Sequence, residues 1–152
     1  MATTSYIKII SSIQTFANQH LQVKRVGFDF YEQLNNFATL NEQYPILFVA
    51  PSNTNFLENV NMITISVYCF DIITKDRSNI NTIISDTNQI LNDLYHWFAN
   101  GDLAGIDLIN VTNATPMNNA LLDYTAGWQM QITLVVDPFT FCDIPFDNYV
   151  VS

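Results

Sequence analysis

Apolar residues recur at helical spacing in two long stretches of the chain. In residues 6–20 they fall on one face at every third or fourth position, and in residues 78–100 the same spacing continues for about five turns. The pattern predicts two amphipathic helices. Asp76 or Ser78 is expected to cap the second helix, and Asn100 with Gly101 to end it. The predicted apolar faces consist of Tyr6, Ile9, Ile10, Ile13, Phe16 and Ala17, and of Ile80, Ile83, Ile84, Ile90, Leu91, Leu94, Trp97 and Phe98.

Two other stretches alternate between two faces, which is typical of β-strands. In residues 62–73 both faces carry apolar side chains, so we expect a central strand that is covered on both sides. In residues 124–137 one face carries Trp128, Met130, Ile132, Leu134 and Val136. Shorter strands are predicted at residues 22–28, with Gly27 marking a bend or bulge, at residues 45–50 and at residues 106–112.

This order of elements predicts an α+β domain rather than a parallel doubly wound sheet. We expect a mostly antiparallel sheet with the two amphipathic helices packed on one face. Residues 1–137 are predicted to form this single domain, and residues 138–152 a C-terminal extension, because Pro138 stops the alternation. Loops are expected at residues 29–44, where a short irregular helix is the alternative, at residues 51–61 and at residues 112–123.

The composition limits the classes of partner. Only 12% of the residues are charged, below the usual share of roughly 25%, which suits a surface that other proteins cover. The net charge of −9 leaves no basic footprint for nucleic acid. No stretch approaches the roughly 20 apolar residues of a membrane helix, and the beginning of the chain lacks the pattern of a signal peptide. We therefore expect a protein made and kept in a reducing cytoplasm.

The chain holds few residues suited to catalysis. Each histidine is expected near the end of a helix, and one cysteine on the core face of a strand. No two of these residues have the short spacing of zinc ligands, and no glycine-rich loop could cradle a phosphate. Asp86 and Asp93 are expected on the solvated face of the second helix. We therefore expect no enzymatic activity, no metal and no cofactor. The residues considered are His20, His96, Cys69 and Cys142.

Several short blocks, taken in order, carry a resemblance to a known class of protein. The blocks are HLQVKRVGFDFYE at 20–32, YPILFVAPS at 44–52, ISVYCFDIITKD at 65–76, SDTNQILNDL at 85–94, GWQMQITLVV at 127–136 and CDIPF at 142–146. Over about residues 5–147 the chain resembles small neck or tail-completion proteins of tailed bacteriophages, in particular crAss-like and other phages that infect Bacteroidetes. The resemblance rests on the order and spacing of the blocks, none of which is diagnostic alone.

The resemblance implies a structural virion protein with a tail-terminator-like α+β fold. Such a protein forms a homo-oligomeric ring of six or twelve copies, in the head–tail connector (neck) or at the end of the tail. It joins portal-side and tail-side proteins around the DNA channel, after synthesis in the bacterial cytoplasm. The alternative is a monomeric α+β adaptor that recognises a single protein partner. An acidic ring lumen would let DNA pass without sticking, and ordinary solubilising acidity is the competing explanation of the charge.

Large apolar residues continue beyond Pro138, where the alternation has ended. Aromatic side chains bury much area at a modest loss of entropy, so they are typical anchors of an interface. We expect the extension to dock on a neighbouring subunit or an adjacent ring, with folding back over its own sheet or helices as the alternative. The interface candidates are Phe139, Phe141, Ile144, Phe146 and Tyr149, together with Phe56 and Leu57 of the loop predicted at residues 51–61.

Overall fold

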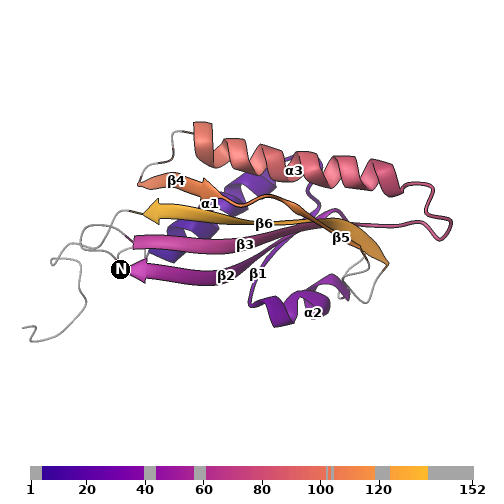
Figure 1. The fold of residues 1–152 in the computed structure, drawn as a ribbon, viewed down its shortest axis with the longest axis horizontal. Helices are drawn as coiled ribbons and strands as arrows, with labels where there is room; N and C mark the ends of the chain where they lie inside the picture. The colour runs from indigo at the N-terminus through magenta and orange to yellow at the C-terminus, as the bar shows by residue number, and fades with distance from the viewer. Residues whose placement is uncertain are drawn as a thin grey trace, which may run out of the picture.

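The computed structural model describes residues 5–39, 44–56, 61–101, 103, 105–118 and 124–136. These residues form helices and a single sheet, which confirms the predicted α+β class (Figure 1). Along the chain the elements are α1 (Ser5–Gln19), β1 (Arg25–Phe28), the 3-10 turn η1 (Tyr31–Gln33), α2 (Leu34–Thr39), β2 (Ile46–Phe56), β3 (Asn61–Ile72), α3 (Ile80–Asn100), β4 (Ile106–Val111), β5 (Thr115–Asn118) and β6 (Thr125–Val136).

The strand order in the sheet is β1-β2-β3-β6-β4, and β5 also pairs with β6. β1 and β2 run parallel, and the other pairs are antiparallel, as predicted for most of the sheet. β3 and β6 pair along their whole length, from Asn61 opposite Val136 to Ile72 opposite Thr125. These two alternating strands therefore lie at the centre of the sheet, where β3 was expected.

The main hydrophobic core lies on the face of the sheet that receives alternate side chains of β3 and β6. Apolar side chains of α1 and α3 belong to the same cluster. Two tryptophan side chains connect these helices to their neighbours. The Trp97 indole N–H of α3 donates to Ser12 Oγ of α1 at 2.9 Å, and the Trp128 indole N–H of β6 donates to the Ile84 carbonyl of α3 at 2.9 Å. Buried members of the cluster include Ile9, Ile13, Phe16, Ile63, Ile65, Val67, Cys69, Ile90, Leu91, Leu94, Phe98, Met130, Ile132, Leu134 and Val136.

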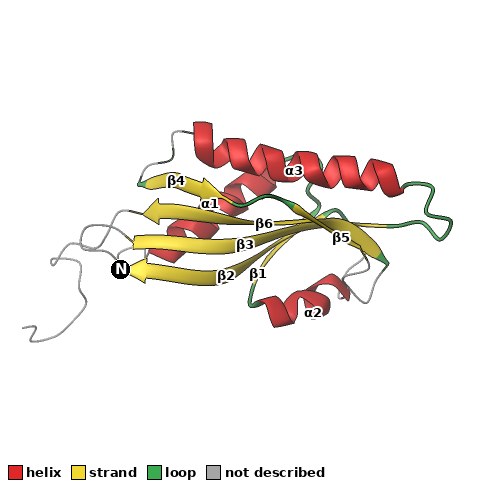
Figure 2. Cartoon of the chain, in the orientation of Figure 1, coloured by secondary structure: helices red, strands yellow, loops and turns green. Residues whose placement is uncertain are grey.

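A further short helix, α2, lies within residues 29–44, where a loop or a short irregular helix was expected, and it packs with a second cluster formed by the other side chains of β2 and β3. Figure 2 shows α2 and α3 at opposite margins of the sheet. The Phe37 ring packs on Phe48 with 5.4 Å between the ring centroids. A Cβ atom at Gly27 would lie 2.4 Å from that Phe37 ring. Gly27 is therefore a point of close approach and not a bulge, since Arg25–Phe28 pairs with Ile46–Val49 in unbroken register.

One predicted strand extends into a segment that was predicted as a loop, and another strand lies wholly within such a segment. β2 continues through Pro51 to Phe56, because this extension pairs with β3 on its inner side. A register shift between Pro51 and Asn53 marks the point where the extension begins. A proline has no N–H to donate, and it is tolerated here because no described strand lies on the outer side. β5 lies within the third predicted loop and pairs with β6.

The beginning of α3 also differs from the prediction. Its N-cap residue is Asn79, whose side chain makes no capping hydrogen bond. Instead, Asn79 Oδ1 accepts from the Thr74 N–H at 2.9 Å, and Asp76 Oδ1 accepts from the Ser78 N–H at 3.0 Å. These bonds shape the turn that leads from β3 into α3.

In the part of the chain that the structure describes, no helix is both long and apolar enough to cross a membrane.

Candidate functional site

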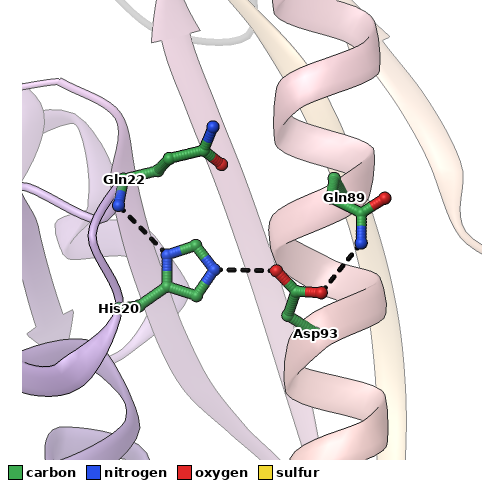
Figure 3. A network of polar contacts seen from close by, with 4 residues as sticks. All are labelled: His20, Gln22, Gln89 and Asp93. Carbon is green, nitrogen blue, oxygen red and sulfur yellow. Dashed lines mark hydrogen bonds and ion pairs between the residues drawn. The ribbon is translucent and has the colours of Figure 1, made fainter.

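His20 and Asp93, which sequence reasoning treated separately, meet between α1 and α3 (Figure 3). The His20 Nε2 lies 2.8 Å from Asp93 Oδ2, and its Nδ1 accepts from the backbone N–H of Gln22 at 3.2 Å. Asp93 Oδ1 in turn accepts from the Gln89 amide at 2.8 Å. Because Nδ1 is an acceptor, the arrangement fits the tautomer with the proton on Nε2.

This polar network is a connection between helices. The side chain of His20 is 14% exposed and that of Asp93 is 37% exposed, so the contact is half sheltered from water. Both ring nitrogens of His20 already have partners within the chain. Asp93 is thus not merely part of a solvated face, since it connects the residue after α1 to α3.

The other candidates for chemistry do not gather around this network. His96 pairs with Asn100 of the same helix, with 2.9 Å between the ring Nδ1 and the amide nitrogen. Cys69 is fully buried in the main core, and burial raises the pKa of its thiol, which disfavours the reactive thiolate. Cys142 lies outside the described residues. Within the described ranges, no group of three or more His, Cys, Asp and Glu could hold a metal ion.

The two arginines are held against aromatic rings of the same chain. The Arg25 guanidinium lies 3.7 Å from the centroid of the Phe37 ring, and its Nη1 is buried without a hydrogen-bond partner. Arg77 donates to the Tyr124 hydroxyl at 2.7 Å. The guanidinium groups therefore support local packing and do not build a basic surface for phosphates.

The first open edge of the sheet is the outer side of Pro51–Phe56, here called the β2 edge. β1 pairs only with Ile46–Val49, so no described strand covers this part of β2. All six residues of the β2 edge are exposed, and Phe56 at its end is 81% exposed. Phe56 is the predicted interface residue that the structure describes. The others, which are Leu57, Phe139, Phe141, Ile144, Phe146 and Tyr149, lie outside the described residues.

The second open edge is the outer side of β4, which is the last strand of the sheet. A groove of about 600 Å³ separates β4 from the C-terminal half of α3, and Tyr95, Phe98, Leu103 and Leu108 help to line it. A smaller hollow of about 160 Å³ continues along α3 and shares Tyr95 and Val111 with the first. We call the two together the α3–β4 groove. Figure 1 shows α3 running alongside β4.

The sheet face opposite the main core is polar beyond the second cluster. Thr64 and Thr133 meet across β3 and β6 with 2.9 Å between their hydroxyl oxygens. A shallow pocket of about 450 Å³ nearby is lined by neutral polar residues such as Ser66, Gln129 and Gln131. This face offers hydrogen-bonding groups without charge, as expected from the low share of charged residues in the chain.

The described residues thus present the β2 edge, the outer side of β4 and the α3–β4 groove as open surfaces, and their titratable side chains are dispersed. Neither edge was identified from the sequence, because both belong to segments with weak alternation. Comparison with known proteins gives no assignment: no protein-family model matches the chain, and no curated protein sequence matches it.

Proposed function

We propose that this chain is a structural subunit of a ring in a tailed bacteriophage, at the head–tail connector or at the end of the tail. In that position it joins portal-side and tail-side proteins around the DNA channel. The observation that carries the proposal is the pair of open edges, the β2 edge and the outer side of β4, at opposite margins of one sheet.

Two different surfaces at opposite margins suit head-to-tail assembly. A heterologous contact repeats from subunit to subunit, and it closes into a ring when the rotation between neighbours divides a full turn. Open strand edges also favour association, because their backbone groups can pair with another chain. A ring of six or twelve copies would cover both edges of every subunit.

The sequence supports the same assignment in two further ways. The blocks between about residues 5 and 147 resemble neck and tail-completion proteins, and the α+β class of the fold agrees with that resemblance. The chain carries fourteen acidic and five basic residues. A lumen lined by such subunits would repel phosphates and let a DNA duplex pass.

Mass photometry of the purified full chain, followed by negative-stain imaging, tests the proposal. We expect a discrete species of six or twelve subunits and ring-shaped particles. The variant Phe56→Asp should shift the population toward monomers, whereas Leu21→Asp is the matched control, since Leu21 is 91% exposed and belongs to neither edge. A wild-type chain that stays monomeric at the highest soluble concentration would contradict the ring and favour the monomeric adaptor.

A further inference from the structure

We infer that the α3–β4 groove receives residues 139–144 of a second copy of this chain, which add a strand to β4. This inference rests on the proposed ring, for which it names the contact between neighbouring subunits. It is carried by the open side of β4, the lining of the groove and the sequence that follows β6.

The strand side of the groove is the outer backbone edge of β4, which has no strand partner among the described residues. β4 pairs with β6 from Ile106 opposite Val136 to Val111 opposite Ile132, and no described strand lies on its other side. Open N–H and C=O groups along such an edge can accept an extended segment from another chain. The register shift between Leu108 and Asn110 divides the edge, so the added strand would pair on each side of Ile109, which is 54% exposed.

The helix side of the groove offers apolar contacts over a matching length. Tyr95 and Phe98 line its wider part, and Leu91 and Met130 line its continuation. The lining of α3 runs from Asn88 to Gly101, just past its end, which corresponds to about 20 Å of helix. About six residues of extended strand span the same distance.

The chain itself supplies a segment of this length and pattern. Residues 139–144 read FTFCDI and are followed by Pro145, which has no N–H and would end the pairing. In an extended segment Phe139 and Phe141 share one face with Asp143 near its end, and Thr140 and Cys142 share the other face with Ile144. The two phenylalanines would therefore fill the groove beside α3, and the threonine and cysteine would continue the polar face of the sheet.

The geometry favours a second copy over the same chain. β6 ends at Val136, which lies opposite Ile106, the first residue of β4. To reach the outer side of its own β4, the segment would have to cross two strand spacings, about 10 Å in a straight line, and reverse its direction. The connection through Asp137 and Pro138 spans at most about 11 Å at full extension, which leaves too little chain for that turn. A segment from a neighbouring subunit meets no such limit.

The native Cys142 provides the test, because Cys69 is fully buried and will not react. In the full chain, Asn110→Cys places a thiol at an exposed position of β4. Asp107→Cys places one at another exposed position of β4, for the case that the added strand pairs with β4 in a different register. Under mild oxidation we expect one of the two variants to form a disulfide with Cys142 that links two or more chains, identified by peptide mass spectrometry. Disulfide geometry requires Cα atoms within about 7 Å, so random encounters contribute little.

Three controls and four distinct outcomes make the result decisive. The link should disappear when Cys142→Ser is added, and it should be absent for Thr54→Cys on the β2 edge. The double variant Phe139→Ser/Phe141→Ser should reduce the link at least tenfold while the unfolding temperature is unchanged. A disulfide within one chain, or no disulfide at either position, overturns the inference. If the wild-type chain forms rings but neither cysteine variant forms the link, the ring proposal stands and only the inference is removed. If the cysteine variants are linked between chains but the wild-type chain forms no rings, the contact stands and the ring proposal is removed.

Discussion

The Nε2 atom of His20 lies 2.8 Å from Asp93 Oδ2, and this contact joins the residue after α1 to the middle of α3. Since α1 and α3 are separated along the chain by three strands, the contact fixes the end of α1 against an element formed much later in the sequence. Trp97 and Ser12 make a second bond between the same helices. The two bonds together set how α1 lies against α3.

Replacement of Asp93 by alanine should lower the free energy of unfolding by about 1 kcal/mol, because a half-sheltered hydrogen bond is lost. His20→Ala should act similarly, and the double variant should lose less than the sum of the two. Urea unfolding of the four proteins measures this coupling. Gln89→Ala is the control, since it removes only the bond within α3 and should cost less than about 0.5 kcal/mol. A coupling energy of zero would show that the contact does not contribute in solution.

Alanine at the two strand glycines should destabilise the fold to different extents. A Cβ atom at Gly127 would lie 1.8 Å from the Cys69 carbonyl oxygen, so β6 would have to move away from β3. Gly127→Ala should therefore cost at least about 3 kcal/mol. Gly27→Ala meets only the Phe37 side chain and should cost about 1–3 kcal/mol. Thermal unfolding measures both, and Phe37→Leu should recover part of the second loss but none of the first.

Two aspartates should change stability in opposite directions with pH. Burial, with a contribution from Asp86, raises the pKa of Asp71 above its ordinary value of about 4. Its charged form is disfavoured in the folded state, so Asp71→Asn should stabilise the protein at neutral pH. That gain should shrink as the pH falls through the raised folded pKa and vanish below about 4.

Asp76 is the matched comparison. Hydrogen bonds from the backbone and side chain of Ser78, and from Thr74, lower the pKa of this carboxyl. Asp76→Asn should therefore destabilise the protein above about pH 4, and the loss should disappear as the pH falls through the lowered folded pKa. Chemical unfolding between pH 3 and pH 7 checks both variants. Two curves with the same sign would contradict the assignment of these shifts.

Phe56→Asp should weaken self-association without changing the stability of the subunit. The side chain is 81% exposed, so a charge there meets water in the monomer but would be buried in a contact along the β2 edge. We expect at least a tenfold increase in the dissociation constant, measured by sedimentation velocity, with an unchanged unfolding temperature. Equal weakening by Leu21→Asp would show that the effect is not specific to this edge.

The elements that bury one regular stripe of side chains could be predicted from the sequence. The spacing of Ile83, Ile90 and Leu94 in α3 and the alternation of Ile132 and Leu134 in β6 reappear as members of the main core. The α+β class and the mostly antiparallel sheet followed from these elements. Periodicity succeeds here because the same packing that stabilises each element also imposes its pattern.

The elements without such a stripe were missed. The β2 edge contains Pro51 and polar residues, which signal a loop, and it becomes a strand because β3 pairs with it over a long register. β5 is short and carries Pro116. The contact of His20 with Asp93 joins residues 73 positions apart, and no local pattern encodes such a pair. The predicted interface at Phe56 stays a prediction, and its place at the end of a strand was found only in the structure.

The position of β6 has a consequence for synthesis on the ribosome. β6 pairs with β3 on one side and with β4 and β5 on the other, although it follows all of them in the sequence. The nascent chain therefore carries β3 with the backbone groups of one edge unpaired until Val136 has left the exit tunnel. Translation that stops before that point would release a chain prone to aggregate, so cellular yield should depend on chaperones that hold the incomplete sheet.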